Sequence, residues 1–367
     1  MMTAPRVIVI THFPSPYQVE LFNEIERQRP GVLRVLYLNQ RVAARRWSGV
    51  PITHDHEYLD RGKATLATAR DAVRRAHFVV FNYYIDSVSA SLIRARAAAG
   101  GPWCFWGERP GYRFPWLARA ARFGRLAALR SCHAPIWGIG RWAVNAYRDE
   151  FGSDRSYMNL PYYSNLDRFH AVQPKYSEDI TFLFSGSLIH RKGVDLLARA
   201  FLSAAADNPR VRLKIMGDGP LQRRLQQMLA SSSRVQWLGF IDWDGLAPVY
   251  ESAQILCVPS RHDGWGLVVP EGLAAGLPTI ATDHTGAALD LIKPRSNGWL
   301  VRAGDPDGLS RAMKQAARLD RDEWTSMSRR ARASVADHAL PVGAARLLEG
   351  VEQALAQSRE LNEPCAG

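Results

Sequence analysis

The chain has 367 residues, 47% of them hydrophobic, so it is long enough for two domains and apolar enough to bury a sizeable core. Its formal net charge of +12 is uneven: residues 1–172 hold 24 Lys and Arg against 13 Asp and Glu, whereas residues 173–367 hold 23 against 22. No apolar run approaches the ~18 residues that cross a bilayer, and the run after Arg6 is too short for a signal peptide. We therefore expect a protein of the cytoplasm or of the cytoplasmic face of a membrane.

The first half of the chain alternates between short apolar runs and segments with helical spacing. Predicted strands cover residues 6–10, 33–38, 77–84 and 102–111, and predicted helices cover residues 15–28, 65–76 and 87–100. This alternation predicts an α/β layer with a largely parallel sheet.

Residues 159–169 break the alternation with Pro, Ser, Asn and Asp, and we predict that they link two domains. Beyond them, predicted strands cover residues 179–188, 211–217, 235–240 and 254–260, predicted helices cover 193–207, 220–232 and 244–253, and the apolar runs 278–282 and 298–303 follow. We predict two Rossmann-like, doubly wound domains at residues 1–165 and 166–345, with a C-terminal helix and tail at 346–367 that packs back on the first. Ligands of such sheets bind at the carboxyl ends of the strands, which would here face an interdomain cleft.

A glycine turn follows the strand that opens the second half. The strand ends at Phe184, and Arg191, Lys192 and Gly193 stand directly before a helix. A helix N-terminus presents free N–H groups and a positive dipole end, and adjacent cations add the charge-assisted contacts that a diphosphate needs. The alternative is a tight turn with a solvated basic pair, since no Ser or Thr follows the Gly-Lys order of a Walker loop.

Two weaker patterns favour structural explanations. Gly217 and Gly219 form an incomplete dinucleotide motif, which is more typical of a tight strand-to-helix turn. Asp242 and Asp244 resemble a metal-binding carboxylate pair, but Asp244 precedes a predicted helix, where a carboxylate caps free N–H groups. We therefore expect no metal at this pair.

The cysteines are dispersed. Cys104, Cys132, Cys257 and Cys365 stand far apart, and only His133 lies beside one of them. This spacing does not match a metal site, and it favours reduced thiols in a reducing compartment.

The segment 261–280 carries the most informative pattern in the chain. Asp263 and Glu271 stand on either side of a glycine turn that leads into a helix. Gly264 and Gly266 allow backbone amides to approach a ligand because no side chain stands in the way. The carboxylates can accept hydrogen bonds from hydroxyls, although their spacing alone does not identify a catalytic acid and base. Together with the upstream Arg-Lys pair, they match the needs of a nucleotide-sugar.

Residues 159–310 resemble the retaining family-four glycosyltransferases, which have two Rossmann-like domains in the GT-B arrangement. The similarity lies in LPYYSNLDRF, SGSLIHRKGVDLL, MGDGPL, VPSRHDGWGLVVPEGLAAGLPTI and NGWLVRAGDPDGL, which occur in the family's order and near its spacing. The N-terminal half is similar only in organisation.

The resemblance implies roles toward a nucleoside-diphosphate-sugar donor, which is a substrate, and it implies no cofactor. Lys192 would hold the diphosphate with help from Arg191. Glu271 would bind the ribose, and Asp263 would contact the sugar hydroxyls. The other implied donor-binding residues are Gly186 and Ser187 in the phosphate turn, Gly239, Phe240 and Ile241 near the base, and Gly264, Gly266, Leu267 and Val268 around phosphate and sugar.

Two positions depart from the family's pattern. Ser187 stands where the family often has Arg, so one phosphate contact is missing or comes from elsewhere. Asp263 stands where the family has Glu, so the sugar contact is expected to change. In the N-terminal domain, which would bind the acceptor, Glu108 is the catalytic candidate at a position where the family tends to carry a His, and His12 is a second candidate. A structural role is the alternative for each.

We therefore expect a metal-independent, retaining glycosyltransferase of the hexosyl-transferring type that acts on a glycan or lipid-linked acceptor, in cell-surface polysaccharide or glycolipid synthesis. Lys192, Arg191 and helix dipoles would stabilise the leaving diphosphate. One alternative is a basic nucleic-acid-binding protein, although the chain lacks a helix-turn-helix signature, zinc spacing or RNP motif. Another is an inactive nucleotide-sugar-binding module, with which the departures at Ser187 and Asp263 are compatible.

The basic first half also contains an arginine-rich segment with aromatic residues. It includes Arg113, Arg119, Arg122, Arg125 and Arg130 together with Trp116, Phe123 and Leu126. The arginines do not separate from the apolar positions at helical spacing, so the pattern does not establish an amphipathic membrane helix. Our hypothesis is a basic, partly apolar surface for anionic lipid headgroups or a lipid-diphosphate acceptor, and the alternative is a solvated arginine-rich face.

Overall fold

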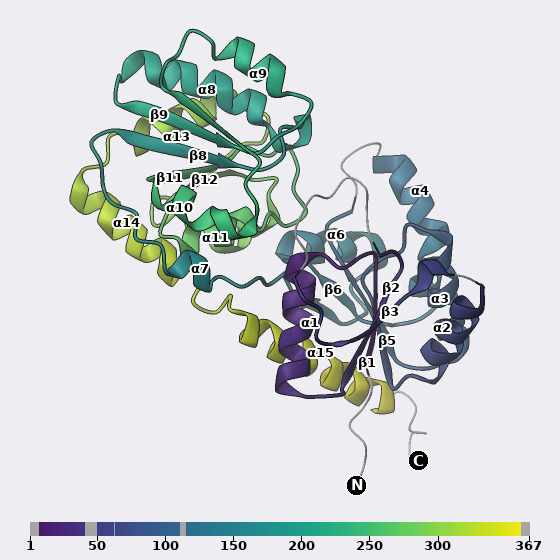
Figure 1. The fold of residues 1–367 in the computed structure, drawn as a ribbon. Helices are drawn as coiled ribbons and strands as arrows, with labels where there is room; N and C mark the ends of the chain where they lie inside the picture. Colours follow the sequence, from purple (N-terminus) through teal and green to yellow (C-terminus); the bar gives the residue numbers. More distant parts are fainter. Residues whose placement is uncertain (1–6, 41–49, 62, 111–114, 361–367) are drawn as a thin grey trace. The chain divides into compact units, whose positions relative to one another are not determined.

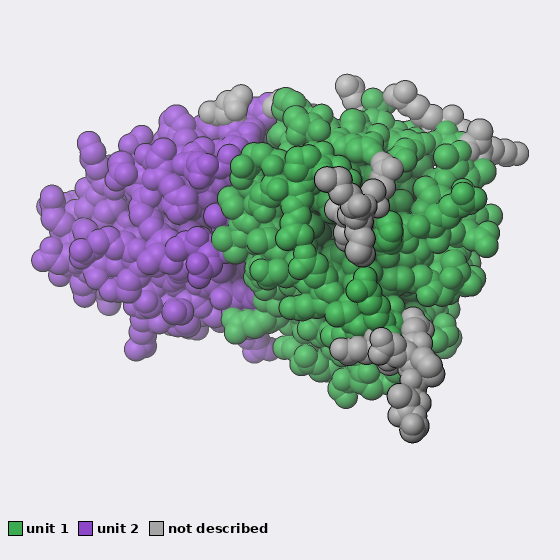
Figure 2. Space-filling model, turned by 90° about the horizontal axis from the view of Figure 1, so that it is seen from below, with its two compact units in different colours: residues 1–164, 340–367 green, residues 165–339 purple. Residues whose placement is uncertain are grey.

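The computed structural model describes residues 7–40, 50–61, 63–110 and 115–360 (Figure 1). The chain divides into two compact units, coloured separately in Figure 2. Unit 1 comprises residues 1–164 and 340–367, and unit 2 comprises residues 165–339.

The described part of unit 1 contains a seven-stranded parallel sheet in the order β3-β2-β1-β4-β5-β6-β7. Its strands are β1 (Val7–Thr11), β2 (Leu33–Tyr37), β3 (Asp55–Tyr58), β4 (Phe78–Phe81), β5 (Trp103–Gly107), β6 (Ile136–Gly138) and β7 (Tyr157–Asn159). Val7 of β1 pairs with Leu33 of β2 on one side and with Phe78 of β4 on the other. The central strands β1 and β4 are buried throughout and apolar except for Thr11 at the end of β1, as expected for strands covered on both faces.

Helices flank this sheet. They are α1 (Pro16–Gln28), η1 (Leu59–Arg61), α2 (Lys63–Arg75), α3 (Ser87–Ala98), α4 (Pro115–Arg125), α5 (Ala127–Arg130), α6 (Arg141–Phe151) and α15 (Leu340–Glu360). Helix α15 lies along α1, and its Arg346 donates to the Tyr163 hydroxyl at 2.7 Å and to the Asn159 carbonyl at 2.6 Å (Figure 1). The boundary expected at residue 345 falls inside α15. Because this helix packs as one piece, the division between the units precedes Leu340.

The described part of unit 2 contains a six-stranded parallel sheet in the order β10-β9-β8-β11-β12-β13. Its strands are β8 (Ile180–Ser185), β9 (Val211–Met216), β10 (Val235–Gly239), β11 (Ile255–Val258), β12 (Thr279–Thr282) and β13 (Gly298–Val301). Its helices are α7 (Asp167–His170), η2 (His190–Lys192), α8 (Val194–Asp207), α9 (Gln222–Met228), η3 (Trp243–Gly245), α10 (Leu246–Glu251), α11 (Val268–Ala274), α12 (Gly286–Leu291), α13 (Pro306–Ala316) and α14 (Arg321–Ala333).

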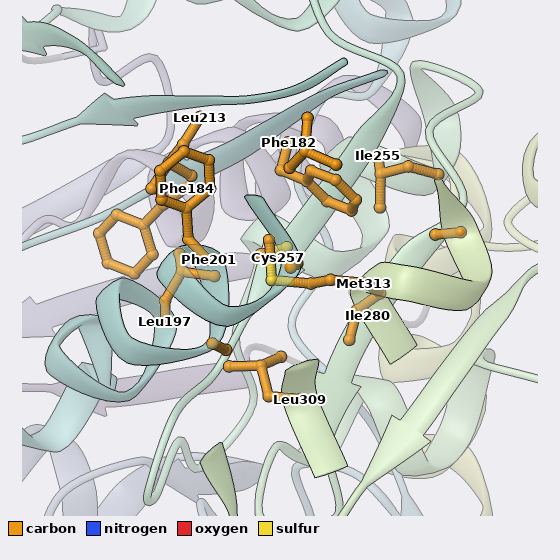
Figure 3. Close-up of a cluster of buried hydrophobic side chains, with 14 of the residues drawn as sticks. Phe182, Phe184, Leu197, Phe201, Leu213, Ile255, Cys257, Ile280, Leu309 and Met313 are labelled. Carbon is orange, nitrogen blue, oxygen red and sulfur yellow. The ribbon is translucent and has the colours of Figure 1, made fainter. Parts of the chain in front are cut away.

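A dense apolar core holds the central strands of unit 2. Figure 3 shows Phe182 of β8 and Cys257 of β11 in one cluster with Phe201 of α8 and Met313 of α13. These four side chains are almost fully buried, and well-packed interiors resist deformation. The loops that leave β8 and β11 therefore start from a rigid base.

Both sheets reverse their strand order at their first strand. β1 lies between β2 and β4, and β8 lies between β9 and β11. At such a switch point two neighbouring loops leave the sheet in opposite directions, and ligands of doubly wound folds bind in the crevice between them. The predicted α/β architecture of two doubly wound sheets is confirmed.

The sequence pattern misplaces some strand limits. The run 77–84 forms a strand only to Phe81, so Asn82 and Tyr83 lie beyond the carboxyl end of β4. Strands β3, β6 and β7 are not predicted, because β3 is polar and the other two have three residues each.

Candidate functional site

The loops after β8 and β11 form one surface at the switch point of unit 2. The N–H of Arg261 donates to the carbonyl of Arg191 at 2.8 Å. Gly193 has a φ of +68°, and a Cβ there would overlap the Pro259 carbonyl oxygen, so only glycine permits this approach. The two motifs found separately in the sequence therefore lie together.

An ionic cluster occupies this surface. Lys192 Nζ lies 2.5 Å from Asp263 Oδ2, and Arg191 Nη1 lies 3.6 Å from Asp263 Oδ1. Burial of Asp263 alone raises its pKa, but the charges of Lys192 and Arg191 outweigh burial and hold the pKa below its usual value. The ion pair is therefore present at neutral pH and is lost only when the pH falls through that lowered pKa. The three groups together carry one excess positive charge, which suits an anionic ligand.

A second ion pair joins the same two loops. The Arg261 guanidinium donates to both carboxylate oxygens of Asp195, each at 2.7 Å, and to the His190 carbonyl at 2.7 Å. Asp195 lies in the first turn of α8, so Arg261 fixes that helix start against the β11 loop. Sequence reasoning missed this pair, because an acidic residue in a first helical turn is common and its partner stands far away along the chain.

Glu271 lies on α11 and is buried, with 7% of its surface exposed. The Tyr250 hydroxyl of α10 donates to Glu271 Oε2 at 3.1 Å. Burial raises the pKa of Tyr250 well above its usual value, so the phenol keeps its proton and remains a donor. Tyr250 gave no signal in the sequence, since a Tyr in a helix is usually a core residue.

The predicted phosphate turn and base-binding residues lie at neighbouring strand ends. The Gly186 N–H donates to the Met216 carbonyl at 3.0 Å, and the Gly217 N–H donates to the Gly239 carbonyl at 2.7 Å. A Cβ on Gly217 would overlap the Gly186 carbonyl oxygen, which explains the glycine after β9. Side-chain exposure varies: Ser187 and Phe240 are exposed and Ile241 is partly buried.

The glycine turn between the two carboxylates is tightly packed. Gly264 and Gly266 are buried, and Gly266 has a φ of +90°. The Gly286 N–H donates to the Asp263 carbonyl at 3.1 Å, so the turn also contacts the start of α12. Leu267 is the N-cap residue of α11, and Val268 is the first residue of that helix. The N-cap makes no side-chain hydrogen bond.

The two acceptor-domain candidates lie at the carboxyl edge of the unit 1 sheet. His12 follows β1, and its ring stacks on Tyr83 with centroids 4.3 Å apart. Glu108 follows β5 and is exposed, and its carbonyl accepts a hydrogen bond from the Tyr147 hydroxyl at 2.8 Å. The structure places the two residues at the carboxyl edge of the same sheet.

A polar network that the sequence did not reveal fills the switch point of unit 1. Asn82 Oδ1 accepts from the Thr11 hydroxyl at 3.0 Å and from Gln18 Nε2 at 2.5 Å. Asn82 Nδ2 donates to the Trp106 carbonyl at 2.9 Å. The available signal was the position of Asn82, a polar residue directly after a buried strand.

The arginine-rich segment is only partly a surface. Arg122 is buried and pairs with Glu150 at 2.8 Å, and Leu126 is fully buried, so neither belongs to the predicted exposed face. Leu117 and Phe123 of α4 are 48% and 62% exposed. Around them Arg119, Arg125 and Arg130 are exposed. Arg113 and the side chain of Trp116 lie outside the described residues.

The carboxylate pair after β10 includes a helix cap. Asp242 Oδ1 accepts from the Trp243 N–H at 2.8 Å and caps η3, while the side chain of Asp244 lies outside the described residues. Across the described ranges, no three His, Cys, Asp or Glu side chains gather as metal ligands. None of the helices described combines the length and apolar character needed to cross a membrane.

Two doubly wound parallel sheets of this topology are the architecture of the GT-B fold. Residues 166–334 match the model of the family described as glycosyl transferases group 1. This match covers nearly all of unit 2, so unit 2 is a domain of that family. The resemblance to family-four GT-B glycosyltransferases is confirmed.

Known proteins support this assignment at different levels. HepE of Anabaena, solved in complex with UDP, superimposes on 95% of this chain and 100% of its own with a TM-score of 0.76 and 14% identity. An uncharacterized glycosyltransferase of Methanocaldococcus jannaschii is 31% identical over 149 residues, 40% of this chain and 37% of that protein. The GDP-mannose-dependent monoacylated alpha-(1-6)-phosphatidylinositol monomannoside mannosyltransferase of Corynebacterium glutamicum is 26% identical over 191 residues, 47% and 50% of the two chains. The matches to the two curated relatives thus span half of their length or less.

Proposed function

We propose that the protein is a retaining, metal-independent glycosyltransferase. It transfers a sugar, of the hexose type, from a nucleoside-diphosphate donor to a hydroxyl of a glycan or lipid-linked acceptor, in the synthesis of surface polysaccharide or glycolipid. The family of unit 2 supports sugar transfer. The names of similar proteins support the substrate classes, because HepE was solved with UDP and the Corynebacterium enzyme acts on a mannosylated lipid.

The observation that carries the proposal is the charge of the unit 2 switch point. Lys192 and Arg191 face one buried carboxylate, Asp263, so the cluster is net positive where two glycine-rich loops meet. A diphosphate gains negative charge as it leaves, and fixed cations in a partly buried site stabilise that charge more than water does. Lys192 and Arg191 would therefore contribute mainly in the transition state.

Each carboxylate would recognise a different part of the donor. Glu271 would accept hydrogen bonds from the ribose. Asp263 would accept them from the sugar hydroxyls while its other contacts keep Lys192 in place. The shorter Asp at this position moves the accepting oxygens back by one methylene, so Asp263 is a candidate determinant of donor choice.

The reaction would proceed by front-side attack. The bond between the anomeric carbon and the diphosphate oxygen breaks, and the acceptor oxygen bonds to the same face of that carbon. The acceptor's proton passes to the leaving phosphate oxygen, so no separate protein base is required. Exclusion of water from the closed site would limit hydrolysis of the donor.

The acceptor would bind unit 1. His12 and Glu108 lie at the carboxyl edge of its sheet, and the exposed Leu117 and Phe123, with the arginines near them, would contact an anionic membrane surface. The excess of positive charge in residues 1–172 supports this assignment.

A thermal-shift panel of UDP-, GDP-, ADP-, CDP- and dTDP-sugars tests the proposal, because a ligand that binds only the folded state raises the melting temperature. We expect one base to stabilise the protein and its sugar to be released by turnover. Stabilisation without any turnover would favour an inactive binding module. Salt-sensitive retention on DNA without any nucleotide-sugar effect would favour the nucleic-acid alternative.

A further inference from the structure

We infer that Tyr250 is a positioning residue that holds the Glu271 carboxylate in the orientation needed to bind the donor ribose. The inference rests on the proposed function, because it takes the ribose role of Glu271 from there. Tyr250 lies outside the motifs that carry the family resemblance, and it acts through Glu271 without needing to contact the donor.

The first support is a direct hydrogen bond to the carboxylate. Tyr250 Oη donates to Glu271 Oε2 at 3.1 Å. The Ser185 side chain also acts on the phenol and lowers its pKa against the larger effect of burial. Ser185 is the last residue of β8, directly before the phosphate turn at Gly186. The phenol therefore lies between the strand end that leads into the phosphate turn and the carboxylate proposed to bind ribose.

The second support is the fixed direction of this hydrogen bond. A buried phenol with a pKa well above its usual range keeps its proton, and that single proton is directed at Glu271. A hydrogen bond of fixed direction restricts the rotation of the Glu271 side chain.

The third support is the rigidity of the groups on both sides. Tyr250 is fully buried, and its ring packs on Phe169 with centroids 4.9 Å apart. On α11, a Cβ added to Gly272 would overlap the Leu256 side chain, so this helix lies tightly against β11. A carboxylate that must meet two ribose hydroxyls gains affinity when its orientation is set before binding.

The test compares Tyr250→Phe with wild type, using the nucleoside diphosphate that binds best among UDP, GDP, ADP, CDP and dTDP. Its 2′,3′-dideoxy analogue is the second probe. By titration calorimetry, Tyr250→Phe should bind the intact nucleotide about three- to tenfold more weakly, the range expected for one lost hydrogen bond. Affinity for the dideoxy analogue should be unchanged. The control Tyr176→Phe, which loses a hydroxyl contact to the Leu319 carbonyl elsewhere in unit 2, should change neither affinity.

Equal losses for both probes would show that Tyr250 only supports the fold, and no loss for either would also overturn the inference. Glu271→Ala separates this failure from failure of the proposed function. If Glu271→Ala loses about ten- to hundredfold in affinity while Tyr250→Phe loses nothing, only the positioning role is wrong. If Glu271→Ala also binds normally, or no nucleotide binds wild type, the proposed ribose site is wrong. Should Tyr250→Phe fail to fold, Tyr250→Met, which also removes the hydroxyl, provides the same comparison, with the loss again expected for the intact nucleotide alone.

Discussion

The switch points of the two units share a topology and differ in charge. In unit 2 the loops after β8 and β11 bring Lys192 and Arg191 to Asp263. In unit 1 the corresponding strand ends, those of β1 and β4, are joined by the neutral groups of Thr11 and Asn82. The switch point of unit 2 is thus built with ions, and that of unit 1 with amides and hydroxyls.

This difference matches two kinds of ligand. Paired charges cost desolvation free energy, so a site gains from them where a ligand carries charge of its own, as a diphosphate does. A network of neutral donors and acceptors costs less to bury and suits a polyhydroxylated molecule. The comparison therefore predicts that variants of the two edges affect different substrates.

The largest effect is expected for Lys192→Ala. The variant removes the cation nearest Asp263, and turnover, measured as release of the donor sugar, should fall by about a hundred- to thousandfold. Nucleotide affinity should fall much less, because the charge on the diphosphate grows in the transition state. Lys214→Ala, which loses a contact to the Ser252 hydroxyl, is the control in the same unit. Equal losses in turnover and affinity would mean that Lys192 only anchors the bound donor.

A sharper comparison comes from Asn82→Ala in unit 1. The substitution leaves Thr11 and Gln18 without their shared acceptor, and the free energy of unfolding should fall by about 1–3 kcal/mol. The Michaelis constant for the acceptor should rise about tenfold for one or two lost polar contacts, with unchanged nucleotide affinity. Asn23→Ala, which loses contacts to His54 and Pro51 on the same unit, should destabilise without the acceptor effect. Weaker nucleotide binding by the Asn82 variant would contradict the expectation that the two switch points act on different substrates.

Asp263→Glu is expected to have a moderate effect. The longer side chain keeps its charge but displaces the carboxylate from Lys192 and from a hydroxyl that the shorter acid is proposed to meet. Turnover on the native donor should fall severalfold, roughly the loss of one misplaced hydrogen bond. Steady-state kinetics on a set of donor sugars checks this. Faster turnover on the native donor would show that the Asp is incidental.

The smallest effect concerns the basic surface of unit 1. Sedimentation with anionic vesicles at low salt should retain the protein, and neutral vesicles or high salt should release it. Arg119→Glu with Arg125→Glu should weaken retention, since each arginine near the surface contributes about 1 kcal/mol at most. Arg223→Glu with Arg224→Glu, exposed on unit 2, is the control. Equal binding to both vesicle types would remove the membrane hypothesis.

The strongly periodic parts of the fold were predictable, and the side-chain networks were not. Buried strands such as β1 and β8 are mostly apolar, whereas β3 is polar and gave no signal. The sequence located the glycine turn and its carboxylates because short local motifs carry them. The Arg122–Glu150 pair gave no sequence signal, since the burial of one arginine among several exposed ones depends on a partner that is distant along the chain.

The candidate site shows the same limit. Lys192 and Asp263 were both identified, yet their direct contact follows only from the adjacency of β8 and β11 in the sheet. Tyr250 and Asn82 were missed for the same reason, because each acquires its role from side chains on other elements. Pairing across a parallel sheet is set by the whole fold, which one local pattern does not encode.

Because α15 lies at the end of the chain, unit 2 can finish folding before unit 1 during synthesis. Unit 2 is continuous in sequence, whereas unit 1 takes its last helix from residues that follow the whole of unit 2. Leu347 and Val351 of α15 are buried, so unit 1 lacks part of its interior until those residues have emerged from the ribosome. Domains generally fold as units once their residues are available. Unit 2 can therefore be complete while unit 1 still lacks its last helix.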